Sequence, residues 1–310
     1  MSSDNKDLCT IAIKFDPPLK LAEGPIYRAK DSTFHFLDLW DDQSYIVKLD
    51  PKTADRDPSV PIIKQPFQEF TSVKYFSTNR PGYIAGYYDG IAYIEEATGK
   101  VHPLEKLVED RSVRKMNDGV VDPKGRFWIG EIDVKTQKDI GLGFKNYPIG
   151  RLWRYDPDGS VHLMLDGGLA ISNGLGFSPD FKTFYLNDSF GQLVYAFDFD
   201  LEKGTITNKR IIRDYRGTKI EPDGLVVDVD GNLWIALNGG NAVIQMAPSG
   251  EILKTIPVPA KLVTCPAWAG EDRNWLLVTA GTFENDNGGQ IFKIKTDTKG
   301  MPDFEFTFPE

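Results

Sequence analysis

The chain has 310 residues, of which 41% are hydrophobic and 26% charged, with a formal net charge of −9. This hydrophobic content argues against a disordered chain, and the acidic balance disfavours nucleic acid and membrane surfaces as partners, since both are negatively charged. The N-terminal segment has neither the basic start nor the apolar stretch of a signal peptide, and no apolar run approaches the about 18 residues that span a bilayer. We therefore expect a cytoplasmic protein, in which Cys9 and Cys265 are reduced thiols.

A short strand rich in aromatic and aliphatic residues recurs along the chain with a period of roughly 45 to 55 residues, which lies in the range of propeller blades. Its six copies begin at Phe34, Tyr83, Phe127, Phe184, Leu233 and Trp275. A second strand with period-two alternation follows each copy. These second strands are expected at 45–49, 91–94, 151–155, 193–197, 242–246 and 290–294.

Two further strands can be placed in the repeat. One precedes each anchor strand across hairpin turns such as DPKGR and DVDGN, and an outer one lies in segments such as PIIKQ and HLMLD. Four antiparallel strands in each of six repeats predict an all-β fold, a six-bladed β-propeller that forms a single domain over residues 1–310. One short helix is expected near Leu104 to Asp110. Either 10–15 or 304–308 should supply the outer strand of the other's blade, which would remove an exposed sheet edge.

Side chains with oxygen atoms recur at one position of the repeat, ten or eleven residues before an anchor strand, and a glycine follows directly or one residue later. They are Glu23 in LAEGP, Asn117 in KMNDG, Asn173 in ISNGL and Asp223 in EPDGL. In the second and sixth repeats the position falls near Ser72 and Cys265, which supply no carboxylate. The position is the start of the innermost strand, so four blades are expected to send an oxygen to one level of the central channel.

This group of side chains predicts a site for one divalent metal ion. Two carboxylates in a partly dry channel need a counter-charge, and hard cations prefer oxygen ligands. Calcium is expected first, while magnesium, manganese, zinc and iron stay open. The alternative is that each Asn-Gly or Asp-Gly pair forms an ordinary turn and that water and hydrogen-bonded polar groups fill the channel.

Other chemistries have less support. The three histidines, His35, His102 and His162, are interpreted as structural, and no nucleophile elbow, P-loop or dinucleotide fingerprint occurs. The segment 131–150, with Phe144 and Tyr147, is a long insertion between two strands of the third repeat. It is interpreted either as a lid over the channel or as a passive surface loop.

Four segments together make the chain resemble the regucalcin (senescence marker protein)–gluconolactonase family over nearly its whole length. They are LAEGP at 21–25, NDGVVDPKGRFWIG at 117–130, ISNGLGFSPD at 171–180 and PDGLVVDVDGNLWIA at 222–236. The resemblance implies a six-bladed propeller with a divalent metal, and a metal-dependent hydrolase that opens sugar lactones. A small lactone is therefore the expected partner, and the oligomeric state stays open.

The resemblance also implies roles for particular residues. Glu23, Asn173 and Asp223 match the metal ligands, Asp223 also matches the proposed general base, and Asn117 matches a substrate-contacting asparagine. Lys115 stands where the family often has an arginine, and it is expected to bind substrate with Asn117, although lysine lacks the forked geometry of a guanidinium.

A second departure concerns the sugar-contacting glutamate of regucalcin-like members. Its place falls on Val134, with Glu131 and Asp133 nearby. Three alternatives to a sugar lactonase stay open. They are a non-catalytic calcium-binding or regulatory propeller, a luciferin-regenerating-type enzyme or other esterase with a less polar substrate, and a protein-interaction propeller.

Overall fold

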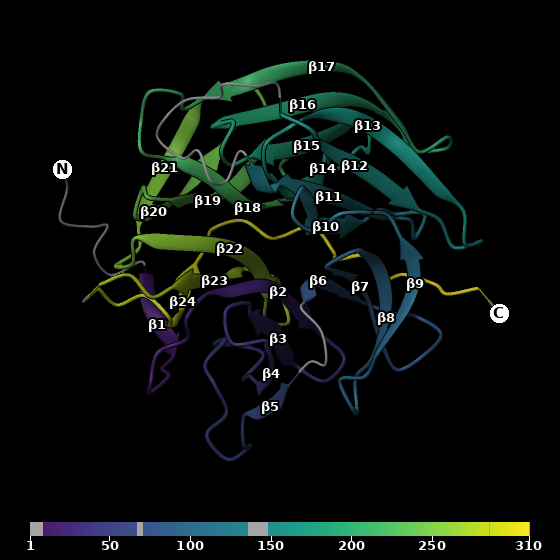
Figure 1. The fold of residues 1–310 in the computed structure, drawn as a ribbon. Coiled ribbons are helices and arrows are strands. Elements are labelled where there is room, and N and C mark those ends of the chain that lie inside the picture. The colour runs from purple at the N-terminus through teal and green to yellow at the C-terminus, as the bar shows by residue number, and fades with distance from the viewer. Residues whose placement is uncertain (1–8, 67–70, 136–147, 285, 310) are drawn as a thin grey trace. The chain divides into compact units, whose positions relative to one another are not determined.

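The computed structural model describes residues 9–66, 71–135, 148–284 and 286–309. These residues form six four-stranded antiparallel sheets, the blades of a six-bladed β-propeller (Figure 1). The fold class predicted from the strand repeats is therefore confirmed. Within the described ranges, no helix is long and apolar enough to cross a membrane.

Five blades consist of four consecutive strands each, ordered from the inner to the outer strand. The first three blades are β2 (Ala22–Arg28), β3 (Thr33–Asp38), β4 (Gln43–Lys48) and β5 (Ile63–Pro66); β6 (Thr71–Phe76), β7 (Gly82–Tyr87), β8 (Gly90–Glu95) and β9 (Val101–Lys106); and β10 (Arg114–Val121), β11 (Phe127–Asp133), β12 (Gly150–Tyr155) and β13 (Val161–Leu169). The next two are β14 (Ser172–Phe177), β15 (Thr183–Asp188), β16 (Leu193–Asp200) and β17 (Thr205–Asp214); and β18 (Glu221–Val227), β19 (Leu233–Asn238), β20 (Ala242–Met246) and β21 (Ile252–Pro257).

The sixth blade combines strands from both ends of the chain. Its inner strands are β22 (Leu262–Ala269), β23 (Trp275–Gly281) and β24 (Ile291–Lys295), and β1 (Cys9–Ile13) pairs antiparallel with β24 as the outer strand (Figure 1). The expectation that a terminal segment supplies an outer strand is confirmed for the N-terminus. The C-terminal segment does not join this blade, because the backbone of Phe306 hydrogen-bonds to Phe76 and Thr78 beside β6.

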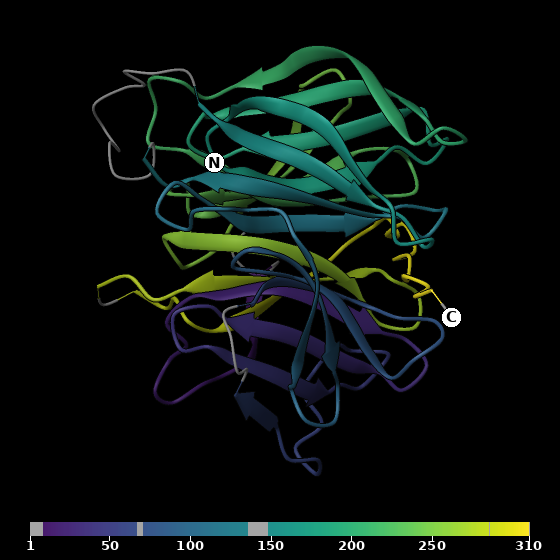
Figure 2. The same cartoon turned by 45° about the vertical axis from the view of Figure 1, so that its right-hand side comes forward.

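The chain divides into two compact units of three blades each. Unit 1 comprises Met1–Pro66 and Gly217–Met301, and unit 2 comprises Phe67–Arg216 and Pro302–Glu310. In unit 1, the inner strands β2 and β18 both pack against the inner strand β22. In unit 2, the inner strand β10 packs against β6 and β14, which Figure 1 labels and Figure 2 draws after a turn of 45°. The single domain expected over 1–310 stays a prediction.

The anchor strands supply the core of both units. Phe34 of β3, Phe127 of β11 and Phe184 of β15 are fully buried, and the ring of Trp128 lies 5.2 Å from that of Phe184 in the neighbouring blade. Each such side chain stabilises the fold by about 2–3 kcal/mol relative to an exposed one. The period-two alternation of the sequence therefore reflects aromatic packing between blades.

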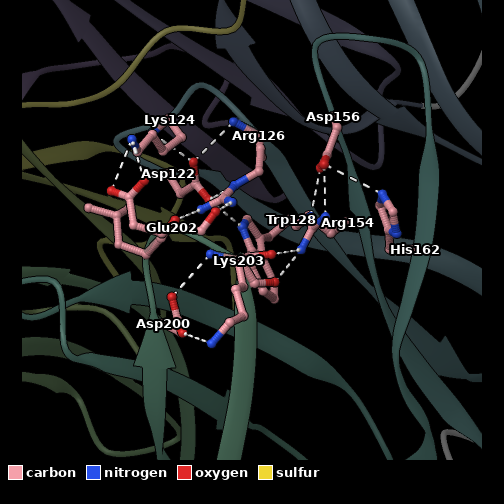
Figure 3. Close-up of polar contacts among 12 residues, drawn as sticks. Asp122, Lys124, Arg126, Trp128, Arg154, Asp156, His162, Asp200, Glu202 and Lys203 are labelled. Atoms are coloured by element: carbon pink, nitrogen blue, oxygen red, sulfur yellow. Dashed lines mark hydrogen bonds and ion pairs between the residues drawn. The ribbon is translucent and has the colours of Figure 1, made fainter.

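The hairpin turns far from the candidate site are held by buried polar groups. Asp122 accepts hydrogen bonds from Arg126 Nε at 2.6 Å and from the Trp128 indole at 3.0 Å. Arg126 also donates to Leu201 O at 2.7 Å, and Arg154 donates to the carbonyl of Gly204 (Figure 3). These two guanidinium groups thereby tie the third blade to the β16–β17 turn of the fourth.

Two expectations about local structure need comment. The helix expected near Leu104 to Asp110 is wrong, because 101–106 forms β9 and pairs with β8, His102 opposite Tyr93. Pro103 fixes φ and lacks an N–H, which suits an outer strand. The insertion in the third blade is confirmed in position, since β11 ends at Asp133 and β12 begins at Gly150. Phe144 and Tyr147 lie outside the described residues, so the lid stays a prediction.

Candidate active site

Every inner strand contains a β-bulge near its start, and in four of the six strands a candidate residue lies at this bulge. The register shifts in β2, β6, β10, β14, β18 and β22, and each shift adds one residue to the inner strand. Glu23 and Asn173 begin their shifts, whereas Asn117 and Asp223 lie inside theirs. A bulge bends a strand and re-aims its side chains. The interpretation of these Asn-Gly and Asp-Gly pairs as ordinary turns is therefore wrong.

In unit 1 the bulges present two carboxylates. Asp223 is only 6% exposed, and its Oδ2 accepts a hydrogen bond from Asn238 Nδ2 at 3.4 Å. Glu23 is half-buried, and its Oε2 accepts the N–H of Gly24 at 3.1 Å. A Cβ on Gly224 would lie 2.7 Å from the Cβ of Cys265. The glycine after Asp223 thus lets β18 approach β22 closely.

In unit 2 the bulges present two amides with a defined orientation. Asn117 donates its Nδ2 to Ser172 O at 2.9 Å, and Asn173 donates its Nδ2 to Ser189 Oγ at 3.0 Å. Because an amide has one donor end and one acceptor end, these bonds leave the oxygen of each side chain as the atom that can bind a cation or a hydroxyl group.

Two carboxyl groups beside the predicted residues were missed by the sequence reasoning. Burial raises the pKa of Asp118 to about 7, against a hydrogen bond from the N–H of Gly119, and burial also raises the pKa of Glu221 to about 7. The strings KMNDG and EPDGL each contain this second acidic residue. Neither residue lies at the repeat position, ten or eleven residues before an anchor strand, that defines the four candidate oxygens.

The basic residues of β10 have different environments. Glu131 is fully buried, and it lies 3.4 Å from Arg114 Nε and 2.9 Å from Arg151 Nη2. The indole of Trp153 donates to the same carboxylate at 2.9 Å. Arg114, one residue before Lys115, and Arg151 thus lie on either side of one buried carboxylate.

Lys115 is the basic residue of β10 that stays a candidate for substrate binding. It is half-buried, and this burial lowers its pKa. Val134, which the resemblance places at the position of the sugar-contacting glutamate, is half-buried and donates its N–H to Val113 O at 3.0 Å.

The histidines and cysteines have structural surroundings. His35 is fully buried beside the Thr33 hydroxyl, His102 lies 2.7 Å from Glu95, and His162 lies 3.4 Å from Asp156. Their interpretation as structural residues is consistent with these contacts. Cys9 and Cys265 are free thiols, and burial raises the pKa of Cys9 to about 12. Cys9 is therefore a poor nucleophile at neutral pH.

The oxygen atoms of these residues suit a hard divalent cation. Glu23 and Asp223 supply carboxylates, and the amide of Asn173 has its nitrogen engaged by Ser189. In the part of the chain that the structure describes, no three His, Cys, Asp or Glu side chains gather around one point. The predicted ligand set contains two carboxylates and an amide, so it would not form such a group. Glu23 and Asp223 lie in unit 1, Asn173 in unit 2, and their convergence stays a prediction.

The family model described as SMP-30/Gluconolactonase/LRE-like region matches residues 21–282. The chain belongs to this family. It is 34% identical to regucalcin of Bos taurus over 66% of its length and 70% of the relative's. It is 26% identical to the pentonolactonase XacC of Haloferax volcanii over 95% and 97%.

A solved structure shows the same fold. The structure of regucalcin from Agrobacterium tumefaciens, described as a calcium-binding protein, matches with a TM-score of 0.82 and 24% identity over 96% of this chain and 97% of the other. The resemblance expected from the four sequence segments is thus confirmed, and family membership supports a lactonase type of function.

Proposed function

We propose that the protein is a metal-dependent lactonase that opens a sugar lactone, with Glu23, Asn173 and Asp223 as the metal ligands. The observation that carries the proposal is the repeated bulge, because in four inner strands a residue with a side-chain oxygen either begins the bulge or lies inside it. The pentonolactonase XacC, which this chain matches over 95% of its length, supports a lactone as the substrate class. Calcium is the first candidate for the metal because all proposed ligands are oxygens, and a calcium-binding protein of this fold supports it.

A bound divalent cation would supply a Lewis acid that polarises the lactone carbonyl and stabilises the negative charge formed as water attacks. Asp223 takes one proton from the attacking water. It returns this proton to the ring oxygen as the acyl C–O bond breaks, which leaves the open hydroxy acid. Asn238 donates to Asp223 Oδ2 and so orients this carboxylate.

Asn117 and Lys115 orient the substrate in this proposal. Asn117 has its amide nitrogen engaged by Ser172 O, so its oxygen can accept a hydrogen bond from a ring hydroxyl. Lys115 donates to substrate oxygens from a half-buried position, where desolvation strengthens such contacts.

A second candidate substrate class is a less polar lactone or ester, as for a luciferin-regenerating-type enzyme. The specific observation in its favour is that Arg114 is held by Glu131 and that Val134 replaces a polar contact. Fewer polar groups for a sugar would then face the substrate. If the protein hydrolyses no lactone or ester but binds calcium, the alternative of a non-catalytic calcium-binding propeller is the one that holds.

The test is a panel of sugar lactones, aliphatic lactones and simple esters, with proton release as the readout, in calcium, magnesium, manganese or zinc and in excess chelator. We expect lactone hydrolysis that chelation abolishes and added metal restores. Asp223→Ala should remove this activity, and Glu251→Gln, an exposed carboxylate of the same blade, should keep it. Turnover that survives both the chelator and Asp223→Ala would overturn the proposal.

A further inference from the structure

The residue that ends β15 holds the chain just before Asn173. Asp188 is 2% exposed, and its carboxylate accepts the N–H groups of Ile171 at 2.9 Å and Ala170 at 3.1 Å, and also that of Gly191 at 3.1 Å. Ile171 lies two residues before Asn173. The buried carboxylate thus fixes the backbone that leads into the bulge of β14.

The next residue fixes the side chain of Asn173 itself. Ser189 is 4% exposed, and its Oγ accepts the Nδ2 of Asn173 at 3.0 Å. The N–H of Ser189 donates to Ile171 O at 3.1 Å, so the hydroxyl is held to the same backbone. The oxygen of the same amide accepts the N–H of Gly174 at 3.2 Å. Without the Ser189 hydroxyl, this longer bond would be the one described contact left to orient the Asn173 amide.

The first blade contains the same backbone arrangement around Glu23. Asp38 ends β3, is 2% exposed, and accepts the N–H of Lys20 at 2.9 Å on one oxygen and that of Leu21 at 2.9 Å on the other. Leu39 donates its N–H to Leu21 O at 2.9 Å. Leu21 lies two residues before Glu23, as Ile171 does before Asn173.

We propose that Asp188 with Ser189, and Asp38, are positioning residues that aim the oxygens of Asn173 and Glu23 at the proposed cation. The inference rests on the proposed function. A carboxylate suits this role because each oxygen only accepts, whereas an asparagine would turn an NH₂ group toward one of the two N–H donors. Groups that orient ligands in this way typically change metal affinity by about 10- to 100-fold when they are lost.

The experiment measures calcium binding to the full chain by titration calorimetry, at a temperature where circular dichroism shows each variant folded. The variants are Ser189→Ala, Asp188→Asn and Asp38→Asn. Two controls remove the same kinds of group at the opposite, turn end of a hairpin. Ser178→Ala removes a hydroxyl that accepts Thr183 N–H at 2.9 Å, and Asp228→Asn alters a fully buried carboxylate.

We expect calcium dissociation constants about 10-fold larger in all three positioning variants. The controls should have lower melting temperatures but a wild-type dissociation constant. A wild-type calcium dissociation constant in both Ser189→Ala and Asp38→Asn would overturn this inference and leave the proposed function standing. An equal weakening of calcium binding in both controls would do the same. If wild-type protein fails to bind calcium or any other divalent ion, the proposed function falls together with it. Ser189→Ala decides the matter for Asn173 if Asp188→Asn does not fold.

Discussion

The β18–β19 hairpin contains the dipeptide Asp-Gly twice, and the two copies have opposite properties. Asp223-Gly224 lies within β18, where Asp223 is nearly buried and Gly224 is needed for space beside Cys265. Asp230-Gly231 lies in the turn, where Asp230 is exposed and Gly231 is needed for its positive φ of 88°. The dipeptide alone therefore does not indicate function. Its position relative to the anchor strand does.

The largest expected effect concerns the two aspartates of this comparison. Asp223→Asn should lower kcat/KM for lactone hydrolysis by about 1,000-fold, because it removes a metal-binding carboxylate and the proposed base together. Asp230→Asn should leave kcat/KM within about 2-fold, since that side chain is exposed and lies in the turn. Initial rates of proton release with saturating metal measure both. Equal rates for the two variants would show that Asp223 has no catalytic role that Asp230 lacks.

The next prediction concerns stability and not activity. It removes a buried carboxylate at the turn of the β18–β19 hairpin, at the end away from Asp223. Asp228 is fully buried and accepts the Trp234 indole at 3.0 Å and the Gln245 amide at 3.1 Å. Asp228→Ala leaves these donors buried and unpaired, so the free energy of unfolding should fall by about 3 kcal/mol. Urea unfolding measures the loss. Turnover per folded molecule should stay at the wild-type level, and a parallel loss of turnover would contradict the separation of the two ends.

Alanine substitutions of the two glycines separate two reasons for a glycine. Gly224 is needed because a side chain would overlap Cys265, and Gly231 is needed because its φ is positive. Gly224→Ala should destabilise the protein by about 2 kcal/mol, since the new Cβ would overlap Cys265. Gly231→Ala should cost about 1 kcal/mol, from the positive φ. Thermal unfolding of both variants gives the comparison. The double variant Gly224→Ala/Cys265→Ala should regain part of the first loss, because it removes the sulfur that the new Cβ would meet, and no recovery would show that crowding by the Cys265 sulfur is not its cause.

A further prediction concerns the pH dependence of stability, which the bulge end of the inner strands should show. The pKa of Asp118 is raised to about 7 in the folded protein from its usual 3.8. The folded state therefore binds more protons than the unfolded state between about pH 4 and pH 7, and stability falls as pH rises through this window.

Unfolding in urea at pH 4.5 and 7.5, in excess chelator, measures this slope. Asp118→Asn should make the slope shallower without abolishing it, because the raised pKa of Glu221 contributes a slope of the same sign over the same window. Asp214→Asn should leave it unchanged, because Arg216 lowers the pKa of Asp214 to about 2, and that group is ionised in both states across the window. A wild-type slope in Asp118→Asn would contradict the raised pKa.

The blades could be predicted from the sequence because their signals are local. Alternation within strands and glycine-rich turns both act over a few residues, and they gave the six repeats and the four candidate oxygens. The helix near Leu104 was wrongly expected for a related reason. No pattern of residues within that segment indicates that it pairs with β8 as an outer strand, because the pairing depends on residues outside the segment.

The contacts that the sequence analysis did not predict join residues that are far apart in the sequence. Glu131 and Arg151 lie on opposite sides of the long insertion in the sequence and form an ion pair, and Ser189 contacts Asn173 from the turn that follows β15. Such pairs are brought together by strand register and not by any spacing in the sequence. The bulges belong to the same class, because an extra residue is visible only against its partner strand.

The pairing of β1 with β24 has a consequence for synthesis in the cell. Thr10 lies opposite Lys293, so β1 meets its partner strand only after the strands of the other five sheets have been synthesised. Five sheets can assemble from neighbouring hairpins as they emerge, while the sixth needs a closure of high contact order, which slows folding. In the nascent protein β1 therefore stays unpaired while those five sheets form, and a chain that stops before residue 291 cannot complete its last sheet.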